Sequence, residues 1–463
     1  MVVVPWKKSA LALLVAGTLS ACGGGGSSSS ADIIDNDPTP SVPETSAPDT
    51  DTPTPQPEPE QPTAKALQMD HANRFLLTSD LARPSIGVPA IAEDGDAAVM
   101  WMEEVAGQDY VKVARYDRAN DIWMPARQLD NGSLEAYISR GWDHPRFDVA
   151  MGDQLLAAAW RDDNNGLYAS THRDDLGWQG NPTLLSPVTD TQVDFVNAIV
   201  SESGDEAMVI WQGADNMWIS TYSIALNTWS PAVRFFDGTS RSEVALHAVD
   251  GQIYAAWNPK EEGSPAIRIA RYNSGVWFEE NVNNPNNLTA YTAIDLTKTQ
   301  TGMMAAWGAG KQVAQATRTV QYGLGEWTIE GTGLGYNGLS VTDVDIESSD
   351  NGITHLLYTV PQGSNYFFAT QLNTDLGIWK DVEKLGLDLT KMPGSMDVDR
   401  HGNALVYWGN YGTTESSYAP DTGWDADNMM TGGKMNTVEV SQSGYGILTS
   451  LDDDRGILVT MTK

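Results

Sequence analysis

Three carboxylates lie close together in one short stretch of the chain. The segment DVDIESSDNG places Asp343, Asp345 and Glu347 at every second position. In an extended strand this spacing puts all three side chains on one face. Oxygen-rich sites of this kind suit Ca²⁺, because carboxylates so close repel one another unless a cation or water lies between them. The sequence predicts either a calcium site or a row of solvated acids, and it requires no other cofactor.

The same pattern recurs further along the chain, where MDVDRHG contains Asp397 and Asp399, with Arg400 and His401 as candidate partners. The six histidines do not fall at the spacing of zinc ligands. The sequence contains no nucleophile elbow, phosphate loop or dinucleotide fingerprint, and we interpret the glycine-rich GTGLGYNG at 331–338 as a loop. Local motifs therefore identify no catalytic residue.

Three aromatic residues could contact a ligand. Trp142, Trp218 and Tyr411 lie in segments rich in Gly, Asp and Asn, outside the regular aromatic repeats of the chain. Aromatic side chains in such segments can stack on sugar rings or anchor a protein partner, and they can equally pack within the fold. They are the candidate ligand-binding residues.

The elements that must position these residues are revealed by two series of aromatic residues with a period near fifty. The first is Trp101, Trp160, Trp211, Trp257, Trp307, Tyr358 and Trp408. The second follows it in step and consists of Trp123, Trp178, Trp229, Trp277, Trp327, Trp379 and Trp424. Two markers with one shared period indicate a single supersecondary unit used many times.

One unit predicts four short strands. In the third copy they are Phe195–Ser201, Ala207–Gln212, Met217–Ser223 and Trp229–Phe236. The second strand is almost wholly apolar, as expected of a strand covered on both faces, and tight turns rich in Gly, Asp and Asn separate the runs. Four antiparallel strands with a variable outer edge are typical of a β-propeller blade.

The ends of the chain give the number of blades. Second-strand sequences occur eight times, and the last unit stops after three strands. The segment 73–79 can supply the missing outer strand, which would leave no free edge where the ends meet. We therefore predict an all-β, eight-bladed propeller closed by an N-terminal strand, with seven blades as the alternative.

The N-terminus predicts export. Residues 1–21 combine Lys7 and Lys8 with a short apolar run, as in a secretory signal peptide. Leu19-Ser20-Ala21-Cys22 resembles the bacterial lipobox, which implies cleavage before Cys22 and lipid attachment to its sulfur. Cys22 is the single cysteine, so no internal disulfide can form. Gly23, in place of Asp, implies an outer-membrane destination, at the periplasmic face or the cell surface.

Composition separates a tether from a globular head. Residues 22–68 are rich in Gly and Ser and then in Pro and acidic residues, which predicts a disordered tether. Residues 69–463, the predicted propeller, hold 53 of the 61 acidic side chains and 25 of the 28 basic ones. A head with this charge repels nucleic acids and anionic lipid headgroups. The membrane contact is therefore predicted to be through the lipid alone.

The turns before several closing tryptophans resemble a known motif. RDDLGW (173–178), NTDLGIW (373–379) and APDTGW (419–424) are similar to degenerate Asp-boxes of sialidase-type propellers. The resemblance covers the repeats and implies the fold. It does not extend to the sialidase active site, because Gly87 stands where that family has its substrate-binding arginine.

These observations favour a non-enzymatic lipoprotein whose acidic propeller binds an envelope or secreted protein. A lectin-like propeller that binds a neutral glycan is the first alternative. A glycoside hydrolase or lyase, with acids contributed by several blades, is the second.

Overall fold

The computed structural model describes residues 67–78, 83–84, 87–130, 147–162, 164–186, 193, 195–240, 244–260, 267–273, 275–290, 292, 294–299, 302–321, 324–361, 365–373, 378–380, 382–388, 394–408, 413–425, 428–430, 434–452 and 456–462. The predicted signal peptide, Cys22, nearly all of the tether, Trp142 and Tyr411 lie outside these residues. All described elements are strands, and no helix long and apolar enough to cross a membrane occurs in this part of the chain.

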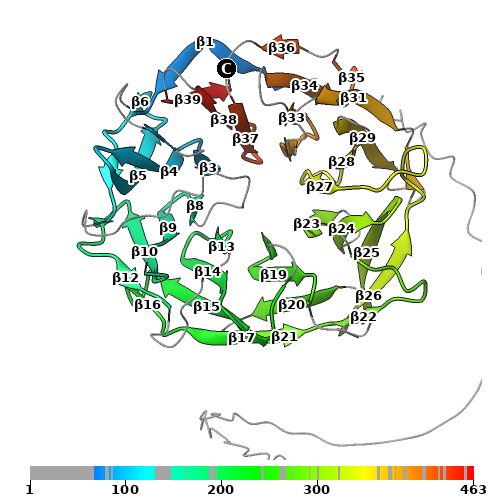
Figure 1. The fold of residues 1–463 in the computed structure, drawn as a ribbon, viewed down its shortest axis with the longest axis horizontal. Coiled ribbons are helices and arrows are strands. Elements are labelled where there is room, and N and C mark those ends of the chain that lie inside the picture. Colours follow the sequence, from blue (N-terminus) through cyan, green and yellow to red (C-terminus); the bar gives the residue numbers. More distant parts are fainter. Residues whose placement is uncertain are drawn as a thin grey trace, which may run out of the picture. The chain divides into compact units, whose positions relative to one another are not determined.

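Eight separate antiparallel sheets surround a central channel, which confirms the eight-bladed propeller (Figure 1). The first blade comprises β2 (Arg83–Pro84), β3 (Val88–Ile91), β4 (Ala97–Val105), β5 (Gln108–Asp117), β6 (Ile122–Trp123) and β7 (Arg127–Gln128), and the second comprises β8 (Phe147–Gly152), β9 (Leu155–Arg161), β10 (Leu167–Arg173), β11 (Gly177–Trp178) and β12 (Thr183–Leu184). The third blade comprises β13 (Val196–Val200), β14 (Glu206–Gln212), β15 (Asn216–Ser223), β16 (Thr228–Trp229) and β17 (Val233–Asp237). The fourth blade comprises β18 (Ala245–Val249), β19 (Gln252–Trp257), β20 (Arg268–Asn273) and β21 (Val276–Glu279).

The fifth blade comprises β23 (Ile294–Thr299), β24 (Gly302–Ala309), β25 (Gln312–Gln321) and β26 (Leu324–Gly331), and β22 (Asn281–Asn283) pairs in parallel with β26. The sixth blade comprises β27 (Asp343–Ser348), β28 (Thr354–Pro361), β29 (Asn365–Asn373), β30 (Ile378–Trp379) and β31 (Glu383–Asp388), and the seventh comprises β32 (Ser395–Val398), β33 (Ala404–Trp408), β34 (Thr413–Ala419), β35 (Gly423–Trp424) and β36 (Asn428–Met430). The eighth blade comprises β37 (Lys434–Val440), β38 (Gly446–Asp452), β39 (Gly456–Thr462) and β1 (Met69–Leu76). The innermost strand of each blade lines the channel, as β3, β8, β13, β23, β27 and β37 show (Figure 1).

The eighth blade joins the two ends of the described chain. Its outer strand is β1, which pairs antiparallel with β39 and places Phe75 opposite Val459. The predicted closure by an N-terminal strand is therefore confirmed, although the strand begins at Met69 rather than near residue 73. Closure in this way pairs the edge of β39, which would otherwise be free to fray.

The first aromatic series forms the centre of the packing between blades. Its six tryptophans and Tyr358 lie on second strands and are at most 2% exposed. Each packed cluster combines residues from neighbouring blades; for example, Met100 of β4 packs in one cluster with Phe147 of β8 and Trp160 of β9. The apolar second strands are thus covered on both faces, as their sequences predict.

The second aromatic series closes the blades on the outside. Trp123 lies directly across the strand pair from Tyr116, with ring centroids 5.4 Å apart. Trp424 pairs in the same way with Tyr418 at 5.3 Å. Such cross-strand aromatic pairs stabilise a sheet, which explains why a tyrosine and a tryptophan recur together in the sequence.

The predicted continuous outer strand is wrong in detail. The third blade has two short pieces, β16 and β17, in place of one strand from Trp229 to Phe236. Both pieces pair with β15, and Pro231 lies between them. Proline has no amide hydrogen to donate to the ladder, so the pairing is interrupted there. Pro125 occupies the equivalent gap in the first blade.

Candidate functional site

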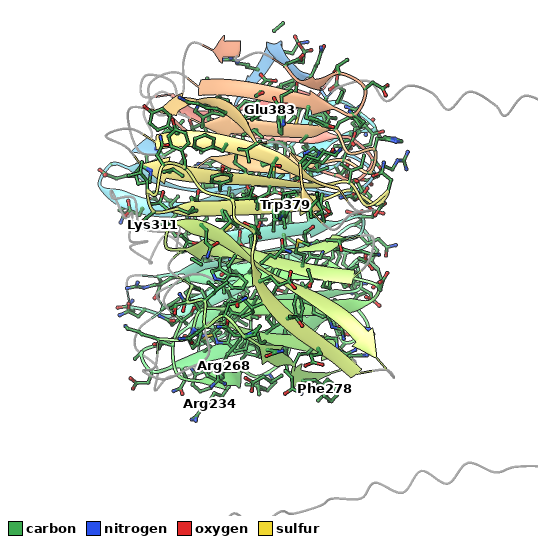
Figure 2. The ribbon with its side chains drawn as sticks, turned by 90° about the vertical axis from the view of Figure 1, so that its right-hand side faces the viewer. Arg234, Arg268, Phe278, Lys311, Trp379 and Glu383 are labelled. Atoms are coloured by element: carbon green, nitrogen blue, oxygen red, sulfur yellow. The ribbon has the colours of Figure 1, made fainter. Side chains whose placement is uncertain are left out.

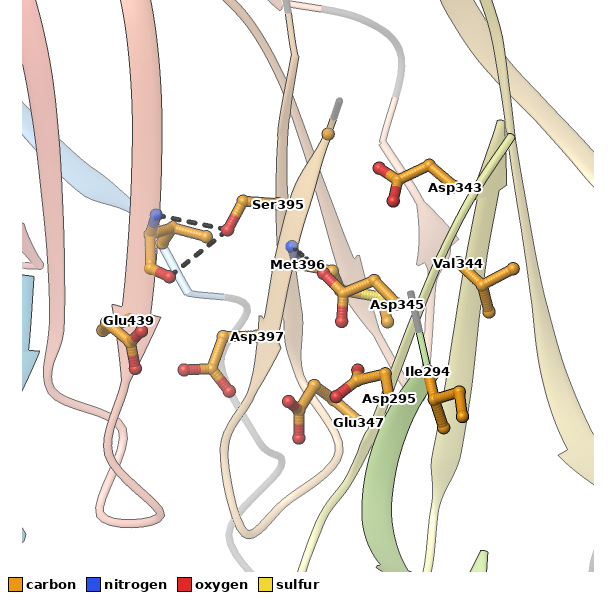
Figure 3. A pocket seen from close by; sticks show the side chains of 12 residues that line it. Ile294, Asp295, Asp343, Val344, Asp345, Glu347, Ser395, Met396, Asp397 and Glu439 are labelled. Atoms are coloured by element: carbon orange, nitrogen blue, oxygen red, sulfur yellow. Dashed lines mark hydrogen bonds between the residues drawn. The ribbon is translucent and has the colours of Figure 1, made fainter. Parts of the chain in front are cut away.

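The inner strands of the second blade and of the fifth to eighth blades direct acidic side chains into the channel. Along β27 the side chains alternate in burial, so Val344 and Ile346 are buried while Asp343, Asp345 and Glu347 are half-buried. This is the shared face that the spacing predicts. Asp295 of β23 and Asp397 of β32 lie on the corresponding faces of the neighbouring blades (Figure 3).

Four of the channel aspartates form the same bond to the next blade. Asp148 Oδ2 accepts a hydrogen bond from the amide of Ala198 at 2.7 Å. Asp295 Oδ2 accepts from Ile346 N and Asp345 Oδ2 from Met396 N, both at 2.8 Å. Asp397 accepts in the same way from Val440 N. We call these four contacts the inter-blade bonds.

The inter-blade bonds have a clear physical role. An innermost strand is an edge strand, and its channel-facing amides have no strand partner. A carboxyl oxygen from the preceding blade accepts a hydrogen bond from one of these amides and so satisfies it. The aspartates therefore join the inner strands of successive blades around part of the ring.

The structure changes the membership of the predicted calcium cluster. Asp295, Asp345 and Glu347 each offer a carboxylate oxygen, and these oxygens lie within 4.8 Å of one another. Asp343 lines the same cavity of about 340 Å³ but does not belong to this group. Figure 3 shows the carboxylates facing one another across adjacent inner strands. The missed residue, Asp295, lies 50 positions before Asp345, so the repeat period contained the signal.

Asp399, predicted to repeat the carboxylate pattern of Asp397, has a different place. It is buried at the turn between β32 and β33, where it accepts hydrogen bonds from the amides of His401 and Asn403. Two carboxylates two residues apart therefore separate, because the strand ends between them.

The channel environment disfavours negative charge. Burial, followed by the charge of Asp295, raises the pKa of Asp345 well above its ordinary value. Burial and the surrounding carboxylates raise the pKa of Glu347 in the same direction. Burial raises the pKa of Asp397 to about 7, against hydrogen bonds from Val440 and Val398 that lower it. The folded protein is more stable when carboxyl groups of this kind take up protons or bind a cation.

A calcium ion is chemically compatible with Asp295, Asp345 and Glu347. Calcium takes six to eight oxygen ligands, and a carboxylate that accepts one amide hydrogen bond keeps further lone pairs available. A cation would also relieve the repulsion among the three carboxylates. It would have to compete with the protons that the raised pKa values favour.

The aromatic candidate within the described residues lies in a strand. Trp218 belongs to β15, directly opposite Trp211, and is half-buried against the packing between blades. The guanidinium of Arg234 lies 5.9 Å from the centre of its ring. These contacts give Trp218 a place in the wall of the third blade rather than in a loop.

Comparison with known proteins establishes the fold class. No family model matches the chain, and no curated protein matches it. Among solved structures, the propeller of Dos1 superposes with a TM-score of 0.53 at 9% identity, covering 84% of this chain and 93% of that one. The lectin BP39L from Burkholderia pseudomallei superposes with a TM-score of 0.46 at 12% identity, covering 69% of this chain and 96% of the lectin. A polysaccharide lyase of family PL25, an ulvan lyase, superposes with a TM-score of 0.46 at 10% identity, covering 84% of this chain and 95% of the lyase.

The class of protein is therefore a β-propeller. At identities this low the similarity concerns the fold alone, and the lectin and the lyase contribute no argument about the activity of this chain. Its function has to be inferred from its own side chains.

Proposed function

We propose that this chain is a lipid-anchored, non-enzymatic envelope protein whose acidic propeller is a binding platform for another protein. The observation that supports it best is the use of the channel aspartates. Asp148, Asp295 and Asp345 each accept a hydrogen bond from a backbone amide of the next blade. The carboxylates thereby form part of a rigid ring, and a rigid surface loses little conformational entropy when it holds a partner.

The partner that suits this head carries a basic surface. Most of the formal charge of −33 belongs to residues 69–463. Complementary charge speeds association and selects the partner, while nucleic acids and anionic lipids are repelled. Because such attraction is screened by salt, complex formation should weaken as ionic strength rises.

The location is part of the same proposal. Residues 1–21 direct export, Cys22 carries the lipid, and residues 22–68 form a tether that lets the propeller bind at a distance from the membrane. The outer membrane, at its periplasmic face or at the cell surface, is the proposed destination. The membrane is contacted through the lipid only.

Calcium is an optional ligand in this proposal. The fold has packed blades and inter-blade bonds that do not depend on an ion, so a cation at Asp295, Asp345 and Glu347 would stabilise the channel without being required. The alternative of a hydrolase or lyase would need a carboxylate pair free to act on a substrate. The bonds to Ile346 and Met396 favour an architectural role for these aspartates.

The test is a crosslinked capture with the intact, lipidated protein in its native envelope, followed by mass spectrometry. We expect one defined set of envelope or secreted proteins, with lower recovery at high salt. Cys22→Ser is the control for the anchor, and it should leave the membrane fraction. Recovery of polysaccharide alone, or of nothing above the background, would contradict the platform.

A further inference from the structure

The outer edges of neighbouring blades form a series of equivalent grooves. Each is bounded by the closing tryptophan of one blade, its outer strand, and the third strand of the next blade. The strand register defines a key position, the residue just before the one that pairs with the closing tryptophan. It is Arg115 in the first blade, Arg271 in the fourth and Gln371 in the sixth.

The groove between the first and second blades is filled by arginines. Arg115 Nη1 lies 2.8 Å from His172 Nε2, and its Nη2 donates to Asp174 at 3.2 Å. Arg127 lies over the ring of Trp178, the closing tryptophan of the second blade, at 5.5 Å. Side chains of the protein itself thus occupy this space.

The groove between the fourth and fifth blades is filled by an ion-pair network. Arg271 Nε lies 3.3 Å from Glu280, and Arg318 Nε of the fifth blade lies 2.7 Å from the same carboxylate. The ring of Phe235 occupies the corresponding space between the third and fourth blades, 4.6 Å from Trp277. Three of the grooves are therefore closed by different residues.

In the groove between the sixth and seventh blades, no side chain of the described residues fills the space. It holds a cavity of about 520 Å³, which is within the range of about 300–1,000 Å³ of small-molecule sites. The described residues that line it are Thr370, Gln371, Ile378, Trp379, Lys380, Glu383, Tyr418, Gly423 and Trp424. Figure 2 faces this side of the propeller and labels Trp379 and Glu383 on it. At the key position, Gln371 is too short to fill the space as Arg115 does in the first blade.

The walls of this cavity are held in place by contacts behind them. Trp379 Nε1 donates to Gln315 Oε1 of the fifth blade at 2.8 Å, which fixes the plane of the indole. Gln371 accepts a hydrogen bond from Lys380 Nζ and bonds the hydroxyl of Tyr418. The ring of Trp424 packs against Tyr418 with centroids 5.3 Å apart. A site fixed in this way loses little entropy when it binds.

We propose that this cavity binds a pyranose ring of an uncharged glycan. Indole and phenol faces stack on the apolar face of a sugar, and the amide of Gln371, the ammonium of Lys380 and the carboxylate of Glu383 are suited to its hydroxyl groups. Among the described residues of the lining, the one cation, Lys380, and the one anion, Glu383, balance each other. The strongly acidic head disfavours an acidic sugar.

This site is independent of the protein platform proposed above, since it lies on the outer wall and involves none of the channel carboxylates. Failure of sugar binding would leave capture of a protein partner intact. Failure of protein capture would equally leave sugar binding intact. The two proposals can therefore be tested and rejected separately.

The test is saturation-transfer NMR on the full-length lipidated protein in a polyoxyethylene detergent, which itself contains no sugar. The probes are methyl β-D-glucopyranoside, methyl β-D-galactopyranoside and methyl α-D-mannopyranoside. We expect transfer to at least one of them, with millimolar affinity. Trp424→Phe should weaken binding about threefold to tenfold, because a smaller ring stacks less well. Trp178→Phe, at the same position of a filled groove, is the matched control and should bind as the unmodified protein does.

A second variant closes the cavity while using residues that the fold already accepts. Gln371→Arg with Lys380→Met reproduces the Arg115 and Met124 pair of the first blade. It should fold, as judged by an unchanged unfolding transition, and lose transfer to the probes. Equal transfer in this variant, or no transfer to any probe in the unmodified protein, would overturn the proposal.

Discussion

Asp345 in the sixth blade accepts a hydrogen bond from the amide of Met396 in the seventh, at 2.8 Å. The two residues are 51 positions apart, and the same contact recurs at Asp295 with Ile346. One carboxylate thus joins two inner strands while adding charge to a crowded channel.

Asp345→Ala should be less stable than Asp345→Asn by about 1–3 kcal/mol. Asparagine keeps an acceptor for the Met396 amide and removes the charge, whereas alanine removes both. Urea unfolding of the two variants measures the difference. Because the charge is absent in both, repulsion in the channel cancels in the comparison. Equal stability of the two variants would show that the inter-blade bond contributes nothing.

Glu347→Gln should stabilise the protein at pH 8. The folded-state pKa of Glu347 is raised by burial and by neighbouring carboxylates, so its charge opposes folding at high pH. As pH falls through the folded pKa towards the ordinary 4.5, the carboxyl becomes neutral in the folded protein and the advantage of the variant disappears. Thermal unfolding should show a gain of about 1–3 °C at pH 8 and little at pH 4.5.

The matched control for this measurement is Glu330→Gln, a change at an exposed glutamate of β26. It should leave the midpoint nearly unchanged at both pH values, since surface substitutions have small effects. A gain in Glu347→Gln that does not depend on pH would contradict a charge effect.

Calcium should raise the unfolding temperature if the cluster binds it. At a free calcium concentration about a hundredfold above the dissociation constant, the stabilisation is about 2.7 kcal/mol. EDTA should reverse the shift, and Glu347→Gln should reduce it. Calcium that leaves the unmodified protein unchanged would make the sequence prediction of a calcium site wrong, without affecting the inter-blade bonds.

His355 should make the protein sensitive to moderate acid. Its ring is buried between the sixth and seventh blades, with Nε2 at 3.1 Å from Gly402 O, and burial lowers its pKa from 6.5 to about 4. The unfolded chain takes up a proton near pH 6.5 and the folded protein only near 4. Stability is therefore lost as pH falls between these values, by about 3 kcal/mol.

The comparison with His355→Gln isolates this effect, because glutamine keeps a donor for Gly402 O and does not titrate. The stability of the unmodified protein relative to this variant should fall as pH is lowered from 7 to 4. His401→Gln, at an exposed histidine, is the control and should follow the unmodified protein. A constant difference across this range would contradict a buried neutral His355.

The closure of the ring by β1 should depend on the side chain of Phe75. Phe75 packs against Tyr116 and Trp123, with ring centroids 6.4 and 6.3 Å away. Phe75→Ala should cost about 2 kcal/mol, less than a fully buried phenylalanine. Leu76→Ala, next to it and 44% exposed, should cost little. Equal unfolding midpoints for the two variants would show that β1 does not stabilise the ring.

The sequence alone determined the repeat, the strand order and the closure. The two aromatic series that begin at Trp101 and Trp123 recur in step, because each blade needs one aromatic residue in the packing between blades and one to close its outer edge. These requirements are local, so they leave a period that can be counted. The outer strands were less predictable, since the break at Pro231 is visible only once both pieces pair with β15.

The candidate sites were decided by the tertiary structure. Asp295 joins Asp345 and Glu347 because the ring brings residues about one repeat apart side by side, while Asp399 turns away where its strand ends. The open groove at Trp379 and Trp424 follows from Gln371 standing where Arg115 fills the equivalent space. The repeat gives every blade the same backbone arrangement and therefore an equivalent groove. Only the side chains packed in each groove determine which of them holds a cavity.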